Sequence, residues 1–307
     1  MSRQDVHSLL EAFATSMPLP ADLEPRLCHA LQHILNHEGS LVRPQIVADL
    51  CAAYAFPADN AGQLAIALEY FHTASLIFDD LPCMDDAVER RGAPCVHVAF
   101  GEPSAILAAL ALINRAYALV WRAIAACPPT LQAQAQQYIE AHLGVSGLLN
   151  GQSLDLNYSS LPHNLATTER VALGKTVSLI RLTLVLPAMI SGATQRELQL
   201  LDRIAVSWGL SYQIVDDLKD VLQGSTETGK TTARDLSLDR PNIAVSIGVN
   251  AALYRMDRLL RLGDRTLERL VERKPSMAFL ARLRRTLQEE MLRVTESACE
   301  GSMQGGS

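Results

Sequence analysis

The fold is decided by the stretch Phe71-His72-Thr73-Ala74-Ser75-Leu76-Ile77-Phe78-Asp79-Asp80-Leu81-Pro82-Cys83-Met84-Asp85-Asp86, in which an apolar run ends in two closely spaced pairs of acids. Negative charge of this density beside a buried wall needs a counter-charge, and carboxylates with open coordination positions suit Mg²⁺ carrying a phosphate. Because Pro82 cannot continue a helical ladder, we expect a tight turn that brings Asp85 back toward Asp79. The alternative is a solvated acidic helix end, which the helix dipole disfavours.

A second acid cluster lies far downstream, in Tyr212-Gln213-Ile214-Val215-Asp216-Asp217-Leu218-Lys219-Asp220. On a helix Asp216 and Asp220 are four residues apart and share a face. Gln213, three residues before Asp216, lies on the same face. Two acid clusters on apolar helices predict two walls of one cavity that clamps metal ions between them.

Composition and charge restrict the fold class and the partners. The 307 residues are 49% apolar and hold no linker, which favours one all-α domain over residues 1–300, a single large helical bundle around a central cavity, with a disordered tail at 301–307. A net charge of −6 argues against nucleic acid as a partner. The six cysteines lack CxxC spacing, so we expect a reduced, cytoplasmic protein. Apolar runs such as 105–113 are shorter than the roughly 20 residues that cross a bilayer, so no transmembrane segment is expected.

Apolar periodicity predicts a chain of helices. Their expected ranges are 4–16, 21–37, 45–56, Asn60 (as N-cap) to Asp80, 102–126, 131–158, 168–189, Thr194 onward through the second acid cluster, 242–256, and Ser276 to about 298. The helix at 131–158 contains Gly144, Gly147 and Gly151. Three glycines inside a helix indicate a close helix approach or room for a ligand, unless the helix is simply softened.

Basic residues lie near the acids in sequence. Arg43 is at a predicted helix start, where anions bind well, although a solvated arginine in a turn would look the same. His72 precedes Asp79 by seven residues on a similar helical face. The adjacent Arg90 and Arg91 suit two different phosphates; the alternative is an internal salt bridge to the acids.

Two lysines extend this set of cations. Lys175, in an otherwise apolar helix, needs a partner, either a phosphate or the solvent at the core edge. Lys230 lies in a Gly-Lys-Thr-Thr segment that is not a Walker A loop, because no strand precedes it and the leading glycine is missing. With these cations, two acid clusters and no obvious pair of nucleophile and base, the chemistry indicated is metal-assisted ionisation of an allylic diphosphate in a dry apolar pocket, followed by attack of a second substrate's double bond.

Both acid motifs resemble those of the trans-isoprenyl diphosphate synthases. Residues 79–85 are similar to the first aspartate-rich motif in its longer form, and residues 216–220 to the second. The segment 79–111, with Arg90-Arg91-Gly92 and His97, looks most like geranylgeranyl diphosphate synthases of bacterial carotenoid pathways. This resemblance implies the isoprenoid synthase fold, a homodimer, isopentenyl and allylic diphosphates as substrates, and Mg²⁺ as the cofactor, with about three ions and Mn²⁺ as an alternative.

The resemblance also implies a role for each matching residue. The direct metal ligands would be Asp79, Asp85 and Asp216, supported by Asp80, Asp217 and Asp220. The allylic diphosphate would be held by Arg90, Lys175 and Lys230, and isopentenyl diphosphate by Arg43, His72 and Arg91. A late lysine of the family is replaced by Arg240, which keeps the charge at the substrate site. Thr176 and Gln213 would stabilise the allylic cation, as catalytic residues together with Lys175.

Two departures leave alternatives open. Ser40 stands where the family has a lysine, and Leu41 replaces the usual next basic residue, so cationic contacts to isopentenyl diphosphate are missing. One alternative is a terpene synthase that uses a single prenyl diphosphate. The other is a non-catalytic partner subunit, against which the two intact acid clusters speak.

Product length follows from the helix that carries the first acids. Ala74 and Ser75 lie five and four residues before Asp79, about 6–7 Å deeper along the helix. Members of the family that stop at farnesyl carry an aromatic ring there, so two small residues leave the pocket open. Phe71, a further turn down, is the predicted floor, unless it is simply a core residue. We therefore expect a C20 product.

Overall fold

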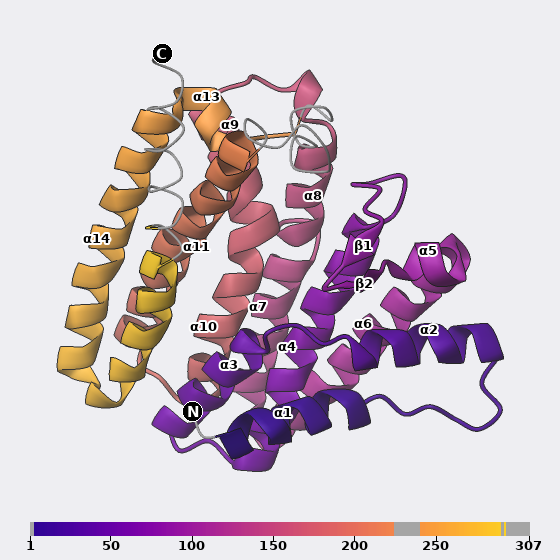
Figure 1. Cartoon of the computed structure of the whole chain (residues 1–307). Helices are drawn as coiled ribbons and strands as arrows, with labels where there is room; N and C mark the ends of the chain where they lie inside the picture. The colour runs from indigo at the N-terminus through magenta and orange to yellow at the C-terminus, as the bar shows by residue number, and fades with distance from the viewer. Residues whose placement is uncertain (1–2, 224–239, 290–291, 293–307) are drawn as a thin grey trace. The chain divides into compact units, whose positions relative to one another are not determined.

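The computed structural model describes residues 3–223, 240–289 and 292, with side chains from residue 8 onward. The chain forms two compact units, Met1–Gln132 and Ala133–Ser307, and each is described by itself. Helices make up nearly all of the regular structure (Figure 1). The predicted all-α fold class is therefore confirmed. The predicted disordered tail at 301–307 lies outside the described residues.

The first unit is built around one internal helix. Its elements are α1 (Arg3–Thr15), α2 (Pro25–Asn36), α3 (Val42–Ala53), α4 (Ala58–Asp79), β1 (Glu89–Arg90), β2 (Ala93–Pro94), α5 (Val96–Phe100) and α6 (Glu102–Ile124). Helix α4 packs against both α3 and α6, and the buried residues of α4 lie on all of its sides, as expected for an internal helix (Figure 1). Tyr70 of α4 donates a hydrogen bond to the carbonyl of Phe13, at 2.6 Å, which holds α1.

The start of α4 differs from the prediction. The helix begins at Ala58, directly after Pro57, so Asn60 lies inside the first turn and is not the N-cap. The side chain of Asn60 instead donates to the carbonyl of Ala123, at 2.8 Å. A cap and a tertiary contact use the same amide group, and nothing local in the sequence tells them apart.

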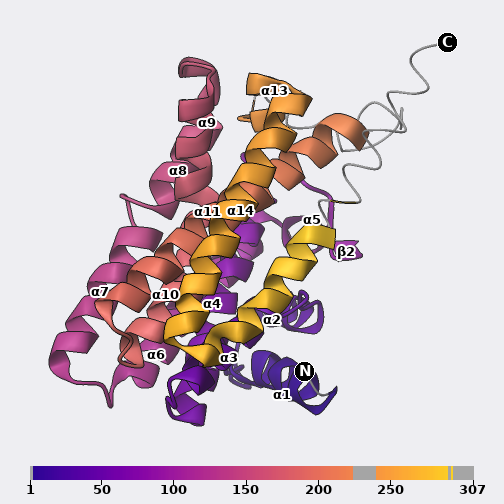
Figure 2. The ribbon, with the colours of Figure 1, turned by 90° about the vertical axis from the view of Figure 1, so that its left-hand side faces the viewer.

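The second unit contains a longer succession of helices. Its elements are α7 (Pro129–Leu143, which begins just before the boundary), α8 (Leu148–Leu156), a 3₁₀ turn (Tyr158–Ser160), α9 (Leu165–Ala172), a π-helical turn (Leu173–Val177), α10 (Ser178–Ile190), α11 (Gln195–Gln223), α13 (Ile243–Ile247), α14 (Val249–Arg273) and a second 3₁₀ turn (Pro275–Phe279). Residues 280–289 are helical. Helix α11 lies beside α14, as Figure 2 shows.

Three predicted helices of this unit are interrupted. The expected helix at 131–158 is two helices, α7 and α8, separated by Gly144–Gly147. The helix at 168–189 contains the π-helical turn, and the helix at 242–256 breaks at Gly248, whose φ is 85°. The start of α11 agrees with the prediction, because Thr194 and Glu197 cap each other reciprocally.

Two described helical stretches, Glu102–Ile124 and Leu165–Ile190, are long and apolar enough to cross a membrane. Within the structure, 44% and 61% of their most apolar windows are buried. Core helices of globular proteins meet the same criterion, so these stretches are weak evidence for a membrane span. Both stretches differ from the expectation that the apolar runs would be too short to cross a bilayer.

Candidate active site

The first acid cluster is a turn folded back on the end of α4. Asp80 is the C-cap of the helix. After Pro82, the amide of Asp85 donates to the carbonyl of Asp79 at 2.8 Å, and the amide of Asp86 donates to that of Leu81 at 3.0 Å. The predicted tight turn that returns Asp85 to Asp79 is therefore confirmed, and two carboxylate-bearing residues share one short loop.

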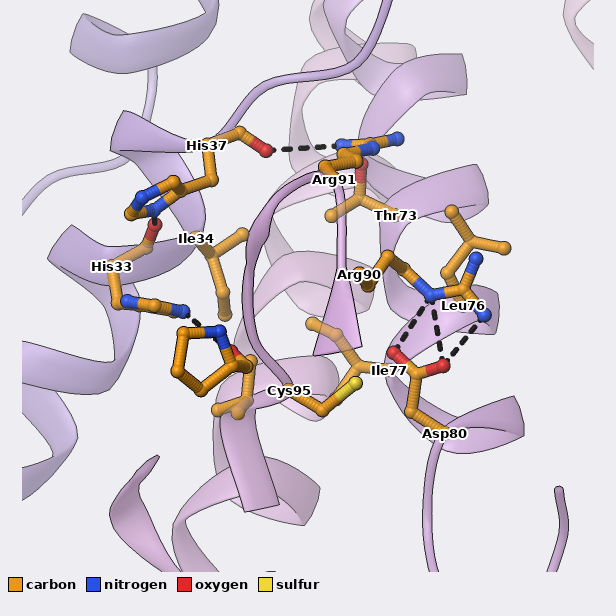
Figure 3. Close-up of a pocket in the computed structure, with 12 residues that line it drawn as sticks. His33, Ile34, His37, Thr73, Leu76, Ile77, Asp80, Arg90, Arg91 and Cys95 are labelled. Carbon is orange, nitrogen blue, oxygen red and sulfur yellow. Dashed lines mark hydrogen bonds and ion pairs between the residues drawn. The ribbon is translucent and has the colours of Figure 1, made fainter. Parts of the chain in front are cut away.

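Asp80, the first residue of this turn, binds Arg90. The Asp80 side chain is buried, and both of its oxygens accept from Nε of Arg90 at 2.8 Å, while Nη2 donates to Oδ1 at 2.6 Å (Figure 3). The internal salt bridge considered for the adjacent arginines thus forms at Arg90. A carboxylate with both oxygens engaged suits a supporting role behind the metal ligands better than direct ligation.

Arg90 and Arg91 point to different partners because a hairpin turn separates them. Strands β1 and β2 pair antiparallel, and the connecting residues Arg91 and Gly92 both have positive φ, 56° and 75°. Positive φ at both central positions defines a type I′ turn. Arg90, on the strand, reaches Asp80, while Arg91, in the turn, donates to the carbonyl of His37 at 3.3 Å. Two neighbouring guanidinium groups are thereby separated, as two different phosphates would require.

His72 is neutral in its surroundings. Burial and the positive charges of Arg43 and Arg91 lower the pKa of His72 to about 2. Its Nδ1 atom is buried and has no hydrogen-bond partner among the described residues. His72 therefore places a neutral ring with unused hydrogen-bonding capacity near Arg43 and Arg91, and does not add a further positive charge.

The departure at Leu41 has a structural reason. Helix α3 starts at Val42, so Arg43 lies in its first turn, as predicted. Leu41 is buried and has a φ of 51°. This left-handed conformation costs on the order of 1 kcal/mol for a residue with a Cβ atom. Leu41 thus fills the core where a longer basic side chain would need solvent, and Ser40 is exposed beside it.

Phe71, two turns before the acids on α4, belongs to a row of three packed aromatic side chains. Phe71 is buried and its ring packs edge-on against Tyr117 of α6, with centroids 4.9 Å apart; Tyr117 in turn stacks on Trp121 at 5.8 Å. Ala74 is fully buried, and the hydroxyl of Ser75 donates back to the helix at 2.8 Å. Phe71 therefore has an aromatic support that helical spacing could not reveal, because Tyr117 lies on another helix.

A small pocket opens between α2, α4 and the hairpin (Figure 3). Its volume is about 50 Å³, room for a few water molecules and too little for a prenyl chain. His33, Thr73 and Cys95 line it beside the two arginines. Burial and the nearby charge of Asp80 raise the pKa of the Cys95 thiol to about 12, so this cysteine is not a nucleophile at neutral pH.

The second acid cluster lies on α11, and its three acids differ in environment. Asp216 is exposed and Asp220 half-buried, four residues apart on one helix, as predicted. Asp217 is 2% exposed and accepts from Gln213 Nε2 at 2.8 Å and from the amide of Ile243 at 2.7 Å. Asp217 thus anchors the start of α13, again a supporting position behind its neighbours.

The predicted catalytic residues of the second unit are joined by hydrogen bonds. Thr176 donates to Oε1 of Gln213 at 2.6 Å, so Gln213 links Thr176 to the anchored acid of α11. Lys175 pairs with the buried Asp155 at 2.9 Å, and Arg240 lies 3.9 Å from the same carboxylate. Sequence reasoning gave Asp155 no role. Its position four residues after Gly151, on the same helical face, was the available signal.

Gly151 explains the geometry at Lys175. A Cβ atom on Gly151 would lie 2.2 Å from the amide nitrogen of Lys175, and one on Gly174 would lie 2.7 Å from the Cα of Gly151. Helix α8 and the π-helical turn are therefore in backbone contact, which is the close approach that the glycines predicted. Lys230, the remaining predicted cation, lies outside the described residues.

The carboxylate pairs fit one kind of metal site. Within the part of the chain that the structure describes, no group of three His, Cys, Asp or Glu side chains is placed to hold a metal ion. Mg²⁺ commonly takes one or two carboxylates and completes its octahedron with water and substrate phosphate oxygens. The carboxylates of Asp79, Asp85 and Asp216 are of the type that Mg²⁺ accepts together with a diphosphate, and their assignment as its direct ligands stays a prediction.

Comparison with known proteins identifies the family of this chain. The profile of the polyprenyl synthetase family matches residues 24–272. The chain is 34% identical over 253 residues to the chloroplastic geranylgeranyl pyrophosphate synthase of Capsicum annuum, covering 82% of this chain and 69% of that one.

Solved structures resemble the chain over nearly its whole length. An FPP/GFPP synthase from Zymomonas mobilis superposes with a TM-score of 0.77 at 26% identity, covering 91% of this chain and 95% of that one. A geranyltransferase from Helicobacter pylori, solved with magnesium and isoprenyl diphosphate, gives 0.77 at 25% identity, covering 97% and 96%. The chain belongs to the polyprenyl synthetase family.

Proposed function

We propose that this protein is a trans-prenyltransferase that joins isopentenyl diphosphate to an allylic diphosphate and releases geranylgeranyl diphosphate, C20. The observation that carries this proposal is the hairpin beside the first acid turn, which directs Arg90 and Arg91 to different sides. A reaction between two diphosphates needs two anion sites, whereas cyclisation of one prenyl diphosphate needs a single site. Membership of the polyprenyl synthetase family supports the same reaction.

Each diphosphate has its own group of residues in this proposal. Arg90, Lys175 and Lys230 bind the allylic diphosphate, and Arg43, His72 and Arg91 bind isopentenyl diphosphate. Arg240 keeps a positive charge at the substrate site. The predicted metal residues form two acid clusters, Asp79, Asp80 and Asp85 in the first unit and Asp216, Asp217 and Asp220 in the second. These acids would hold Mg²⁺, about three ions with Mn²⁺ as an alternative, and the metal would supply positive charge that neutralises the leaving diphosphate.

The chain's own residues handle the cation that ionisation produces. Breaking the C–O bond leaves positive charge on the allyl group, and the oxygens of Thr176 and Gln213 stabilise it. The apolar wall of α4 excludes water, which would otherwise capture the cation. The double bond of isopentenyl diphosphate attacks the allylic cation, and a new C–C bond forms. The isopentenyl group then loses a proton, which leaves with the diphosphate released from the allylic substrate.

The chain-length assignment predicts a change of product when the floor is removed. In Phe71→Ala the pocket loses the ring that rests on Tyr117, so the main product is expected to move from C20 to C25 or longer. The measurement is chromatography of the dephosphorylated products, well below the melting temperature, because Phe→Ala in a core costs about 3–5 kcal/mol. Phe13→Ala is the matched control, since Phe13 is also a buried phenylalanine but packs on Tyr70. A C20 product from Phe71→Ala would refute the floor.

One incubation separates the proposed function from its alternatives. Purified protein is mixed with Mg²⁺, labelled isopentenyl diphosphate and farnesyl diphosphate. Label in a C20 diphosphate is the expected result. An unlabelled hydrocarbon or alcohol would instead identify a terpene synthase, the alternative that Ser40 favours. No turnover alone, with activity restored by a second protein, would identify a non-catalytic partner subunit.

The proposal includes a cytoplasmic homodimer. Several large apolar side chains of α6 are exposed in the single chain, namely Ile106 (39%), Leu107 (53%), Leu110 (50%) and Trp121 (39%). Such a stripe on one long helix is suited to pairing with a second copy. The dimer is checked by measuring molar mass in solution by light scattering.

A further inference from the structure

Glu69 is a buried acid for which the proposed reaction has no use. It lies on α4, one turn before His72, and is 2% exposed. Glutamate is almost never fully buried unless a partner compensates its charge. A carboxylate in this position therefore points to a cation that it holds.

The cations near Glu69 are those assigned to isopentenyl diphosphate. Its Oε1 lies 3.9 Å from Nη2 of Arg91, while Oε2 is buried without a hydrogen-bond partner among the described residues. Burial raises the pKa of Glu69, and the charges of Arg43 and Arg91 oppose that rise. Glu69 is thus the buried negative charge on which Arg43 and Arg91 both act.

Arg91 is held on three sides. Its guanidinium lies over Gly39, where a Cβ atom would be 2.6 Å from Nη2. It also donates to the carbonyl of His37 at 3.3 Å, and its backbone is set by the hairpin turn (Figure 3). With Glu69 on the third side, the direction of the guanidinium is specified by contacts far apart in sequence.

Repulsion between the arginines makes this restraint necessary. The charges of Arg90 and Arg43 both disfavour the protonated form of Arg91, whereas Glu69 favours it more strongly than Glu38 does. Like charges in a partly buried cluster separate unless an opposite charge lies between them. Bidentate recognition of a phosphate requires that the guanidinium fork does not move away and is held in place before the anion arrives.

We propose that Glu69 is a positioning residue, which together with Gly39 holds Arg91 in the direction required by the diphosphate of isopentenyl diphosphate. The inference rests on the proposed function, which assigns Arg91 to that substrate. Glu69 does not touch the substrate in this arrangement. Its effect passes through Arg91 and is confined to one of the two substrates.

The test is Glu69→Gln, which keeps the size of the side chain and removes its charge. KM for isopentenyl diphosphate is expected to rise about tenfold, because misplaced forks lose bidentate contacts, while KM for farnesyl diphosphate and kcat stay within about twofold. If Glu69 acted only through its negative charge, its removal would instead strengthen the binding of the anionic substrate and lower this KM. A KM for isopentenyl diphosphate that is unchanged or lower, or an equal rise for both substrates, overturns the inference.

A second variant is designed to displace the guanidinium of Arg91 without changing the net charge. Gly39→Ala pushes against the guanidinium and is expected to raise the same KM without altering KM for farnesyl diphosphate. Glu38→Gln is the matched control, because Glu38 also favours charged Arg91 but is less buried than Glu69, and its KM values are expected to stay within about twofold.

Failure of the inference and failure of the proposed function are distinguishable with Arg91→Asn. Asparagine followed by Gly92 preserves a type I′ turn, so this variant removes the guanidinium and keeps the hairpin. If Arg91→Asn raises KM for isopentenyl diphosphate and Glu69→Gln does not, Glu69 has no positioning role. If Arg91→Asn also leaves this KM unchanged, the assignment of Arg91 to isopentenyl diphosphate is wrong.

Discussion

Asp79→Asn is expected to lower kcat by about 10³-fold, the size of effect seen when one group that stabilises a developing charge is removed. Asp79 ends α4, and the amide of Asp85 is bonded to its carbonyl, so the substitution removes a charge and leaves the turn intact. The melting temperature is expected to change by no more than a few degrees. In wild type, Mg²⁺ and pyrophosphate added together should raise the melting temperature, because ligands that bind only the folded state stabilise it. This rise should be lost in Asp79→Asn.

Asp86→Asn is the control for that experiment. Asp86 belongs to the same turn, is exposed, and has a φ of 50°, a conformation that asparagine also tolerates. It removes the same charge from the same loop, and kcat is expected to remain within about twofold. An equal loss in Asp86→Asn would mean that the net charge of the turn matters, not one ligand. Turnover of Asp79→Asn within tenfold of wild type would refute the metal assignment.

Gly151→Ala is expected to destabilise the fold by about 3 kcal/mol, the upper end of the usual cost of overpacking. The added Cβ atom would lie 2.2 Å from one backbone atom of the π-helical turn and 2.4 Å from another, and backbone cannot rotate out of the way as a side chain does. Separating α8 from this turn also moves Lys175 from Asp155, so KM for the allylic diphosphate should rise. Chemical denaturation and steady-state kinetics measure the two effects.

Gly62→Ala is a second glycine-to-alanine substitution, and its expected effect on stability is the opposite of that of Gly151→Ala. Gly62 lies inside α4, and no heavy atom lies within 4 Å of the position its Cβ would take. Alanine in a helix interior is about 0.5–1 kcal/mol more favourable than glycine, so this variant should be slightly more stable than wild type. If both variants have the same effect on stability, the close approach of α8 to the π-helical turn is not what Gly151 serves.

Local chemistry explains which parts of the fold were predictable. The turn after Pro82 followed from a missing amide proton, and the start of α11 from Thr194, whose capping contacts with Glu197 lie within one helical turn. The same reasoning misplaced the start of α4, because the amide of Asn60 binds another helix. It also missed the break between α7 and α8, where glycines interrupt the apolar pattern without changing its period.

The candidate site likewise contains features that the sequence could predict and features that it could not. Spacing identified Asp79, Asp85, Asp216 and Asp220, because acids that share a turn or a helical face can be recognised in one stretch of chain. Spacing could not show that Asp80 and Asp217 have both oxygens engaged, since Arg90 lies on a strand and the amide of Ile243 begins another helix. For the same reason Glu69, Tyr117 and Asp155 received no role from sequence reasoning.

The sequence by itself determined the helical fold class, the two acid motifs and the small residues above Phe71, because helical periodicity relates residues three or four positions apart. Only the tertiary structure decided which charges are paired: Arg90 with Asp80, Arg91 with Glu69, and Lys175 with Asp155. Each pair joins separate elements of the chain. Burial then makes each pairing matter, because a charge removed from water is tolerated only beside its partner.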